Sequence, residues 1–88
     1  MKKETQIQIE AEVFRRLIKH FRKRTDVQNI DLMNLANFCR NCLSKWYMQS
    51  AKKKGLRLDY EEAKKIIYGM SYDKWKKKYQ KPISKDKL

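Results

Sequence analysis

Residues 29–50, NIDLMNLANFCRNCLSKWYMQS, form the longest segment of this 88-residue chain with helical periodicity. Apolar side chains recur in it at steps of three and four residues, the spacing of one face of an α-helix. When the residues are placed at about 100° intervals, Leu35 and Leu43 fall on the same face as Cys39. We therefore expect one long central helix over residues 31–54, with Cys39 in the middle of its buried face.

Three shorter helices are predicted around this segment. Residues 7–24 carry one apolar stripe, residues 59–68 begin at a capping-box-like Asp59 and Glu62, and residues 71–80 precede the only proline. The prediction is an all-α, small four-helix domain whose long second helix is central. It spans residues 1–88 as one domain, with an ordered core over about residues 7–80 and frayed termini.

The composition excludes several classes of protein. Two glycines and one proline are too few for the turns of an all-β design. No run approaches the roughly 18 apolar residues of a membrane helix, so we expect a cytoplasmic protein whose two cysteines are reduced. A domain of this length is marginal on its own. A homodimer is therefore expected, and Phe38 and Met48 project from the side of the central helix where a partner could pack.

The net charge of +13 comes from 23 basic and 10 acidic residues and favours polyanionic partners. The basic side chains on the back of the first helix are the electrostatic candidates for a nucleic-acid surface. Their alternative role is the solvated face of an amphipathic helix. These candidates are Arg15, Lys19, Arg22 and Lys23.

Cys39-Arg-Asn-Cys42 is the only compact motif with reactive side chains. Zinc sites use about four ligands, and reactive thiols of oxidoreductases stand at helix N-termini. The predicted helix places Cys39 two turns inside and leaves His20, the only histidine, too far along a neighbouring helix to be a third ligand. Packing in the core is the simplest role for Cys39 and Cys42. A zinc or iron site shared between subunits and a thiol role remain alternatives, and no other cofactor is predicted.

Polar side chains surround the central segment, and we interpret them as a candidate binding surface on its polar back and in the loop before it. Paired carboxylates, a glycine-rich phosphate loop and a supported nucleophile are not recognisable in the sequence, which argues against an enzyme. The residues of this surface are Asp26, Gln28, Asn29, Asp31, Asn34, Asn37, Arg40 and Asn41.

Three segments, FRRLIKHF, RTDVQNIDLMNLANFCRNCLSKWY and YGMSYDKWKKKYQ, resemble the bacterial family called domain of unknown function 1244. The resemblance covers roughly residues 14–80. It implies a small all-helical domain from bacteria and implies no activity. The family pattern often has glycine at the position of Asn37 and proline at that of Ser71.

The sequence thus predicts a non-enzymatic binding or interaction module that acts as a homodimer. One alternative is a nucleic-acid-associated regulator that uses the basic helix face. The other is a thiol or metal-binding protein that uses the CxxC pair.

Overall fold

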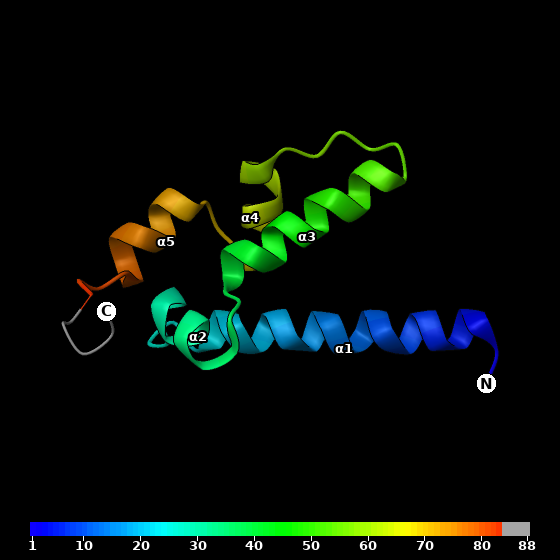
Figure 1. The fold of residues 1–88 in the computed structure, drawn as a ribbon, viewed down its shortest axis with the longest axis horizontal. Helices are drawn as coiled ribbons and strands as arrows, with labels where there is room; N and C mark the ends of the chain where they lie inside the picture. The colour runs from blue at the N-terminus through cyan, green and yellow to red at the C-terminus, as the bar shows by residue number, and fades with distance from the viewer. Residues whose placement is uncertain (84–88) are drawn as a thin grey trace.

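The computed structural model describes residues 1–83 of the chain. Five helices and no strands occur in this range (Figure 1), so the all-α prediction is confirmed and the count of four helices is wrong. The helices follow one another as α1 Lys3–Lys23, α2 Asn29–Ala36, α3 Arg40–Lys53, α4 Tyr60–Tyr68 and α5 Tyr72–Tyr79. Most of the C-terminal segment predicted to be frayed, after residue 80, lies outside the described residues.

The predicted long central helix is broken between α2 and α3. Asn37 ends α2 with a φ of 59° and a ψ of 29°, which is the left-handed conformation. Asparagine is one of the few residues other than glycine that adopts it readily. Cys39 follows in extended conformation as the N-cap of α3. Because the chain turns at residues 37–39, the faces of α2 and α3 do not form one continuous surface.

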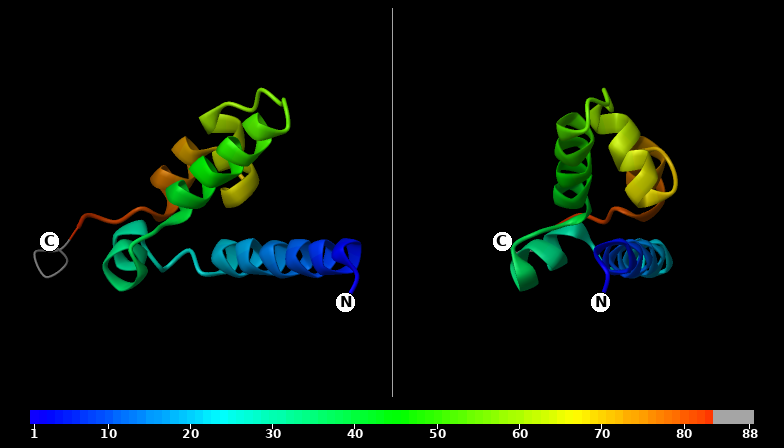
Figure 2. Two further views of the ribbon diagram at one scale, coloured as in Figure 1. Left: turned by 45° about the vertical axis from the view of Figure 1, so that its right-hand side comes forward. Right: turned by 90° about the vertical axis from the view of Figure 1, so that its right-hand side faces the viewer.

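The core lies where α3, α4 and α5 meet α2 and the C-terminal half of α1. Trp75 of α5 and Ile67 of α4 are almost fully buried, and Tyr68 packs edge-on against Trp75 with 5.1 Å between ring centroids. Ile18 and Phe21 of α1 join the same cluster. Helices α3, α4 and α5 stand together on one side of α1, as Figure 2 shows.

The N-terminal half of α1 projects beyond this body. All of the first ten residues are exposed, although α1 already begins at Lys3, earlier than the predicted start at residue 7. The molecule measures 48 × 29 × 20 Å, and its radius of gyration is 14.6 Å. A compact chain of this length would have a radius of gyration of about 12 Å. The projecting helix accounts for the elongated shape in Figure 1.

Arg40 occupies the centre of the fold, where the continuous-helix prediction had placed a polar back. Its side chain is only 1% exposed. The guanidinium donates to the backbone oxygen of Arg24 at 2.9 Å and to Asn29 Oδ1 at 3.0 Å. Its Cζ lies 5.4 Å from the ring centroid of Phe21. The positive charge thus sits at the C-terminus of α1, the negative end of the helix dipole.

Arg22 fixes α1 against α4. Its guanidinium donates to the backbone oxygens of Ile66 and Ile67, which are carbonyls of the last turn of α4. Gly69 ends that helix with a φ of 77°, and a Cβ built there would lie 2.8 Å from Arg22 Nε. Glycine is therefore needed at position 69 for two reasons: it adopts the left-handed conformation that ends α4, and it leaves room for the side chain of Arg22.

Candidate functional site

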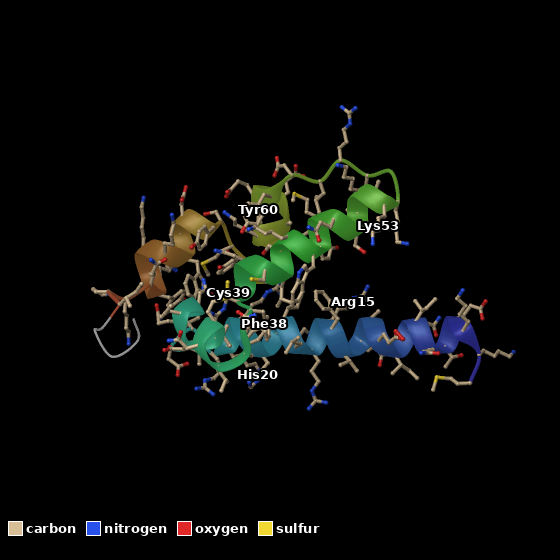
Figure 3. All side chains as sticks on the ribbon, in the orientation of Figure 1. Arg15, His20, Phe38, Cys39, Lys53 and Tyr60 are labelled. Carbon is tan, nitrogen blue, oxygen red and sulfur yellow. The ribbon has the colours of Figure 1, made fainter. Side chains whose placement is uncertain are left out.

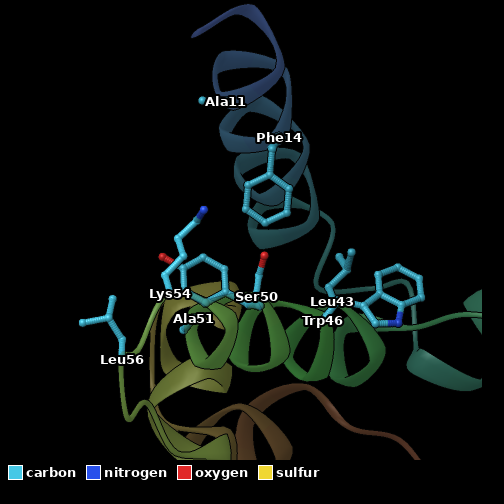
Figure 4. Close-up of a pocket in the computed structure, with 9 residues that line it drawn as sticks. Ala11, Phe14, Leu43, Trp46, Ser50, Ala51, Lys54 and Leu56 are labelled. Carbon is cyan, nitrogen blue, oxygen red and sulfur yellow. The ribbon is translucent and has the colours of Figure 1, made fainter. Parts of the chain in front are cut away.

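An apolar groove lies between α1 and α3. It encloses about 560 Å³. Figure 4 shows Phe14 of α1 pointing toward α3. Its ring lies 6.4 Å from that of Tyr47, centroid to centroid. The groove is lined by Ala11, Phe14, Leu43, Trp46, Tyr47, Ser50, Ala51, Lys54 and Leu56.

Large apolar side chains remain exposed along the groove. Trp46 is 53% exposed, although in a continuous helix it would share the buried face of Cys39, and Leu56 is 63% exposed. Phe38 is partly buried and stacks on Trp46 with 6.0 Å between ring centroids. Sequence reasoning found Phe38 as part of a second packing surface but missed Leu56, which lies outside any helix. It also misplaced Leu35, which is 84% exposed on α2.

The basic residues predicted on α1 divide into two groups. Arg15, Lys19 and Lys23 have exposed side chains. Arg22 holds the end of α4, so it belongs to the packing of α1 rather than to a free basic face. Three of the four candidates therefore remain accessible to a polyanion.

Several residues of the predicted polar surface are internal. Gln28 is 5% exposed and forms a capping box with Asp31. The Asp31 carboxylate accepts a hydrogen bond from the backbone N–H of Gln28 at 2.9 Å. The Gln28 side chain also donates a hydrogen bond to the backbone oxygen of Tyr79 and accepts one from the backbone N–H of Lys81. Gln28 and Arg40 therefore cannot form an exposed binding surface, because the capping and helix-docking bonds use their polar groups.

Asn29 and Asn41 are partly buried and are linked by hydrogen bonds to tyrosine hydroxyls. The Tyr68 hydroxyl donates to Asn41 Oδ1 at 2.7 Å and accepts from Asn29 Nδ2 at 2.9 Å, while Asn41 Nδ2 donates to the Tyr72 hydroxyl at 3.3 Å. Burial raises the pKa of the Tyr68 hydroxyl and lowers that of the Arg40 guanidinium. No buried side-chain nitrogen or oxygen of residues 1–83 lacks a hydrogen-bond partner. This network stabilises the fold.

The remaining polar candidates lie apart from one another. Asp26 is exposed and pairs with Arg24, whose side-chain hydrogen bond lowers the pKa of the carboxyl. Asn34 lies on the exposed side of α2 and Asn37 at its end. A recess of about 140 Å³ beside Gln28, Asn29 and Asn41 is the part of the predicted surface that the structure brings together.

The two cysteines are free and adjacent, with 3.9 Å between their sulfur atoms. His20 is exposed on α1, on the side away from the start of α3 in Figure 3. Among residues 1–83, no three His, Cys, Asp or Glu side chains converge as metal ligands. Within these described residues, the cysteine pair therefore gives a zinc or iron ion two sulfur ligands and no third ligand beside them.

The helical fold, the apolar groove and the buried polar network define a small all-α protein. A family model described as a protein of unknown function, DUF1244, matches residues 27–88, and the chain belongs to that family. No curated protein matches the chain. Within residues 1–83, none of the helices combines the length and apolarity needed to cross a membrane.

Proposed function

We propose that the protein is a non-enzymatic interaction module that acts as a homodimer, with α1 and α3 forming the interface. The observation that carries this proposal is the apolar groove of about 560 Å³ between these helices. Contiguous exposed apolar surface on a small protein is typical of an interaction site. α3 is the C-terminal part of the predicted central helix, from whose side a partner was expected to pack.

The apolar stripe of α1 supports the same proposal. Ile7, Ala11, Phe14, Ile18 and Phe21 follow at alternating steps of four and three residues, the spacing of a helix–helix seam. Phe21 and Ile18 are buried, Phe14 and Ala11 line the groove, and Ile7 is 55% exposed. The stripe therefore runs continuously from the core into solvent. A helix end without tertiary packing is marginal in water, so a partner that covers this stripe would stabilise it.

A second copy suits this surface because each copy carries both complementary parts. The projecting turns of α1 present apolar side chains, and the groove beside them accepts such side chains. In a dimer with two-fold symmetry, each α1 packs against the groove of the other copy. The apolar stripe and the groove of both copies are then buried in the same interface. Dimerisation would also add buried area to a domain that has little core of its own.

Mass measurement in solution by light scattering tests the proposal. At micromolar concentration we expect the mass of two chains. Leu56→Glu introduces a charge into the groove and should yield monomers, whereas Leu35→Glu makes the same change on the exposed face of α2 and should leave the dimer intact. Both wild-type leucines are largely exposed, so neither variant should unfold. A monomeric wild type, or equal behaviour of the two variants, would contradict the proposal.

A further inference from the structure

The cysteine pair lies at the N-terminus of α3, a position that the continuous-helix prediction had excluded. Cys39 is the N-cap, with φ −144° and ψ −176°, and Cys42 lies in the first turn. The sulfur atoms are 3.9 Å apart, and a disulfide bond is about 2.05 Å long. Small side-chain rotations therefore suffice to join them.

The break before α3 is what makes this geometry available. Within a continuous helix, residues three apart have Cβ atoms about 5–6 Å apart, whereas a disulfide needs roughly 3.5–4.5 Å. The extended backbone of Cys39 removes it from the helical path and releases this restriction. The pair can thus close without unwinding α3.

The two sulfurs differ in their access to solvent. Cys39 is 7% exposed and belongs to the core cluster, whereas Cys42 is only partly buried. Burial raises the pKa of the Cys39 thiol and outweighs the backbone amides of Cys42 and Asn41, which lower it. Cys42 is therefore the thiol that an external reagent can reach, and Cys39 is a thiol held beside it.

We propose that Cys39 and Cys42 form a reversible dithiol–disulfide couple that exchanges with low-molecular-weight disulfides such as oxidised glutathione. Three observations carry the proposal: the short distance between the sulfurs, their unequal exposure, and the lack of a third metal-ligating side chain beside them in residues 1–83. The couple is independent of the proposed dimer, because neither sulfur lines the α1–α3 groove.

The reaction proceeds in two exchange steps. The Cys42 thiolate attacks one sulfur of the external disulfide, forms a mixed disulfide and releases one thiolate. Cys39 then loses its proton to solvent and attacks Cys42 Sγ, which forms the intramolecular bond and releases the second thiolate. Two electrons pass from the cysteines to the external disulfide, which becomes two thiols. The reverse sequence with reduced glutathione restores both cysteines.

Intact-mass analysis of the full chain after incubation with oxidised glutathione, followed by alkylation, tests this order of events. Wild type should give the mass of a single chain, not cross-linked to a second one, that carries neither glutathione nor alkyl groups. Cys39→Ser should accumulate a stable glutathione adduct on Cys42, because no neighbouring thiol resolves it. Cys42→Ser should react at Cys39 on the order of tenfold more slowly than Cys39→Ser reacts at Cys42.

Three results would overturn the proposal. In the first, the wild type retains its glutathione adduct, and in the second it forms disulfide-linked dimers. In the third, both wild-type thiols can still be alkylated under conditions in which Cys39→Ser has already formed its glutathione adduct. Far-UV circular dichroism establishes that each variant is folded. Cys39→Ala replaces Cys39→Ser if the hydroxyl is not tolerated in the core, and the wild-type result stands without either variant.

Discussion

The guanidinium of Arg40 lies over the indole ring of Trp75, with 4.9 Å between Cζ and the ring centroid. This contact joins the first residue of α3 to the last helix, while hydrogen bonds from the same guanidinium reach the end of α1 and the start of α2. Tyr68 of α4 contacts two members of this network, Trp75 and Asn29. One buried cation therefore organises four of the five helices.

Arg40→Ala should destabilise the protein by about 3 kcal/mol or more, because it leaves buried backbone carbonyls and Asn29 Oδ1 without their donor. Arg40→Lys keeps the charge but loses the planar fork and the stacking on Trp75, so its cost should be intermediate. Urea unfolding of each variant measures the free energy. Arg57→Ala, at an exposed arginine between α3 and α4, is the matched control and should change stability little. Equal stabilities of the Arg40→Ala and Arg57→Ala variants would show that Arg40 does not organise the core.

Much of the helical content could be predicted from the sequence, because the apolar residues of α1, α4 and α5 keep helical spacing and α4 and α5 begin after capping residues. Asp59 and Ser71 cap α4 and α5. Their side chains accept hydrogen bonds from the backbone N–H groups of Glu62 and Lys74, respectively. These features depend on local interactions, which a single sequence records.

The arrangement of the candidate site could not be predicted in the same way. A single left-handed residue, Asn37, interrupts an otherwise periodic segment, and several of the orientations assigned from a continuous helix are therefore wrong. Arg40 and Ser44 would lie on the polar side of a continuous helix, yet they are only 1% and 0% exposed. Leu35 was predicted on the buried face and is instead exposed to solvent. The signal available was the asparagine itself, at a position where the family pattern often has glycine.

Gly69→Ala should destabilise the protein more than Gly55→Ala. Both glycines have a φ near +80°, at 77° and 79°, so alanine is strained at either position by roughly 1–2 kcal/mol. Only at Gly69 does the added Cβ meet Arg22, which must then move and weaken its bonds to the α4 carbonyls. We expect this displacement to add about 1 kcal/mol to the cost of Gly69→Ala.

Thermal or urea unfolding of the two glycine variants measures this difference directly, since Gly55 has no atom within 4 Å of the corresponding Cβ. Combining each variant with Arg22→Ala provides the control. The extra cost at Gly69 should disappear in the Arg22→Ala background, and the cost at Gly55 should remain. An undiminished difference between the glycine variants would contradict the role assigned to Arg22.

The stability of the protein should fall as the pH rises above about 10. Burial raises the pKa of the Tyr68 hydroxyl, so above the ordinary pKa of 10.0 the unfolded chain loses this proton while the folded chain retains it. Unfolding then releases a proton, and rising pH favours the unfolded state by up to about 1.4 kcal/mol per pH unit for this group. Below pH 10 both states are neutral at Tyr68, and the group causes no pH dependence.

Tyr68→Phe isolates this effect. At neutral pH the variant should be about 1–2 kcal/mol less stable than wild type, because it loses the hydrogen bonds to Asn41 and Asn29. Above pH 10 the gap should narrow, since the variant has no proton to lose at this position. Urea unfolding between pH 7 and pH 11 measures the gap, and a constant gap would show that burial of the hydroxyl does not couple folding to pH.

Salt should strengthen the proposed dimer and weaken any binding of nucleic acid. Two copies that each carry a net charge of +13 repel one another, and salt screens that repulsion while apolar burial across the groove is retained. Binding to a nucleic acid depends on counterion release, so its affinity falls as salt rises. Sedimentation and fluorescence anisotropy with a labelled duplex, each measured from about 50 mM to 200 mM salt, separate these dependences.

Charge-matched variants identify the surface responsible for any duplex binding. Alanine at Arg15, Lys19 and Lys23 removes three charges from α1, and alanine at Lys74, Lys77 and Lys78 removes three from exposed positions on α5. Nonspecific attraction depends on total charge, so it predicts the same loss of affinity and the same decrease of the salt slope in both triple variants. A site on the basic face of α1 predicts a larger loss in the first variant. If the wild type does not bind the duplex even at low salt, the nucleic-acid alternative is excluded.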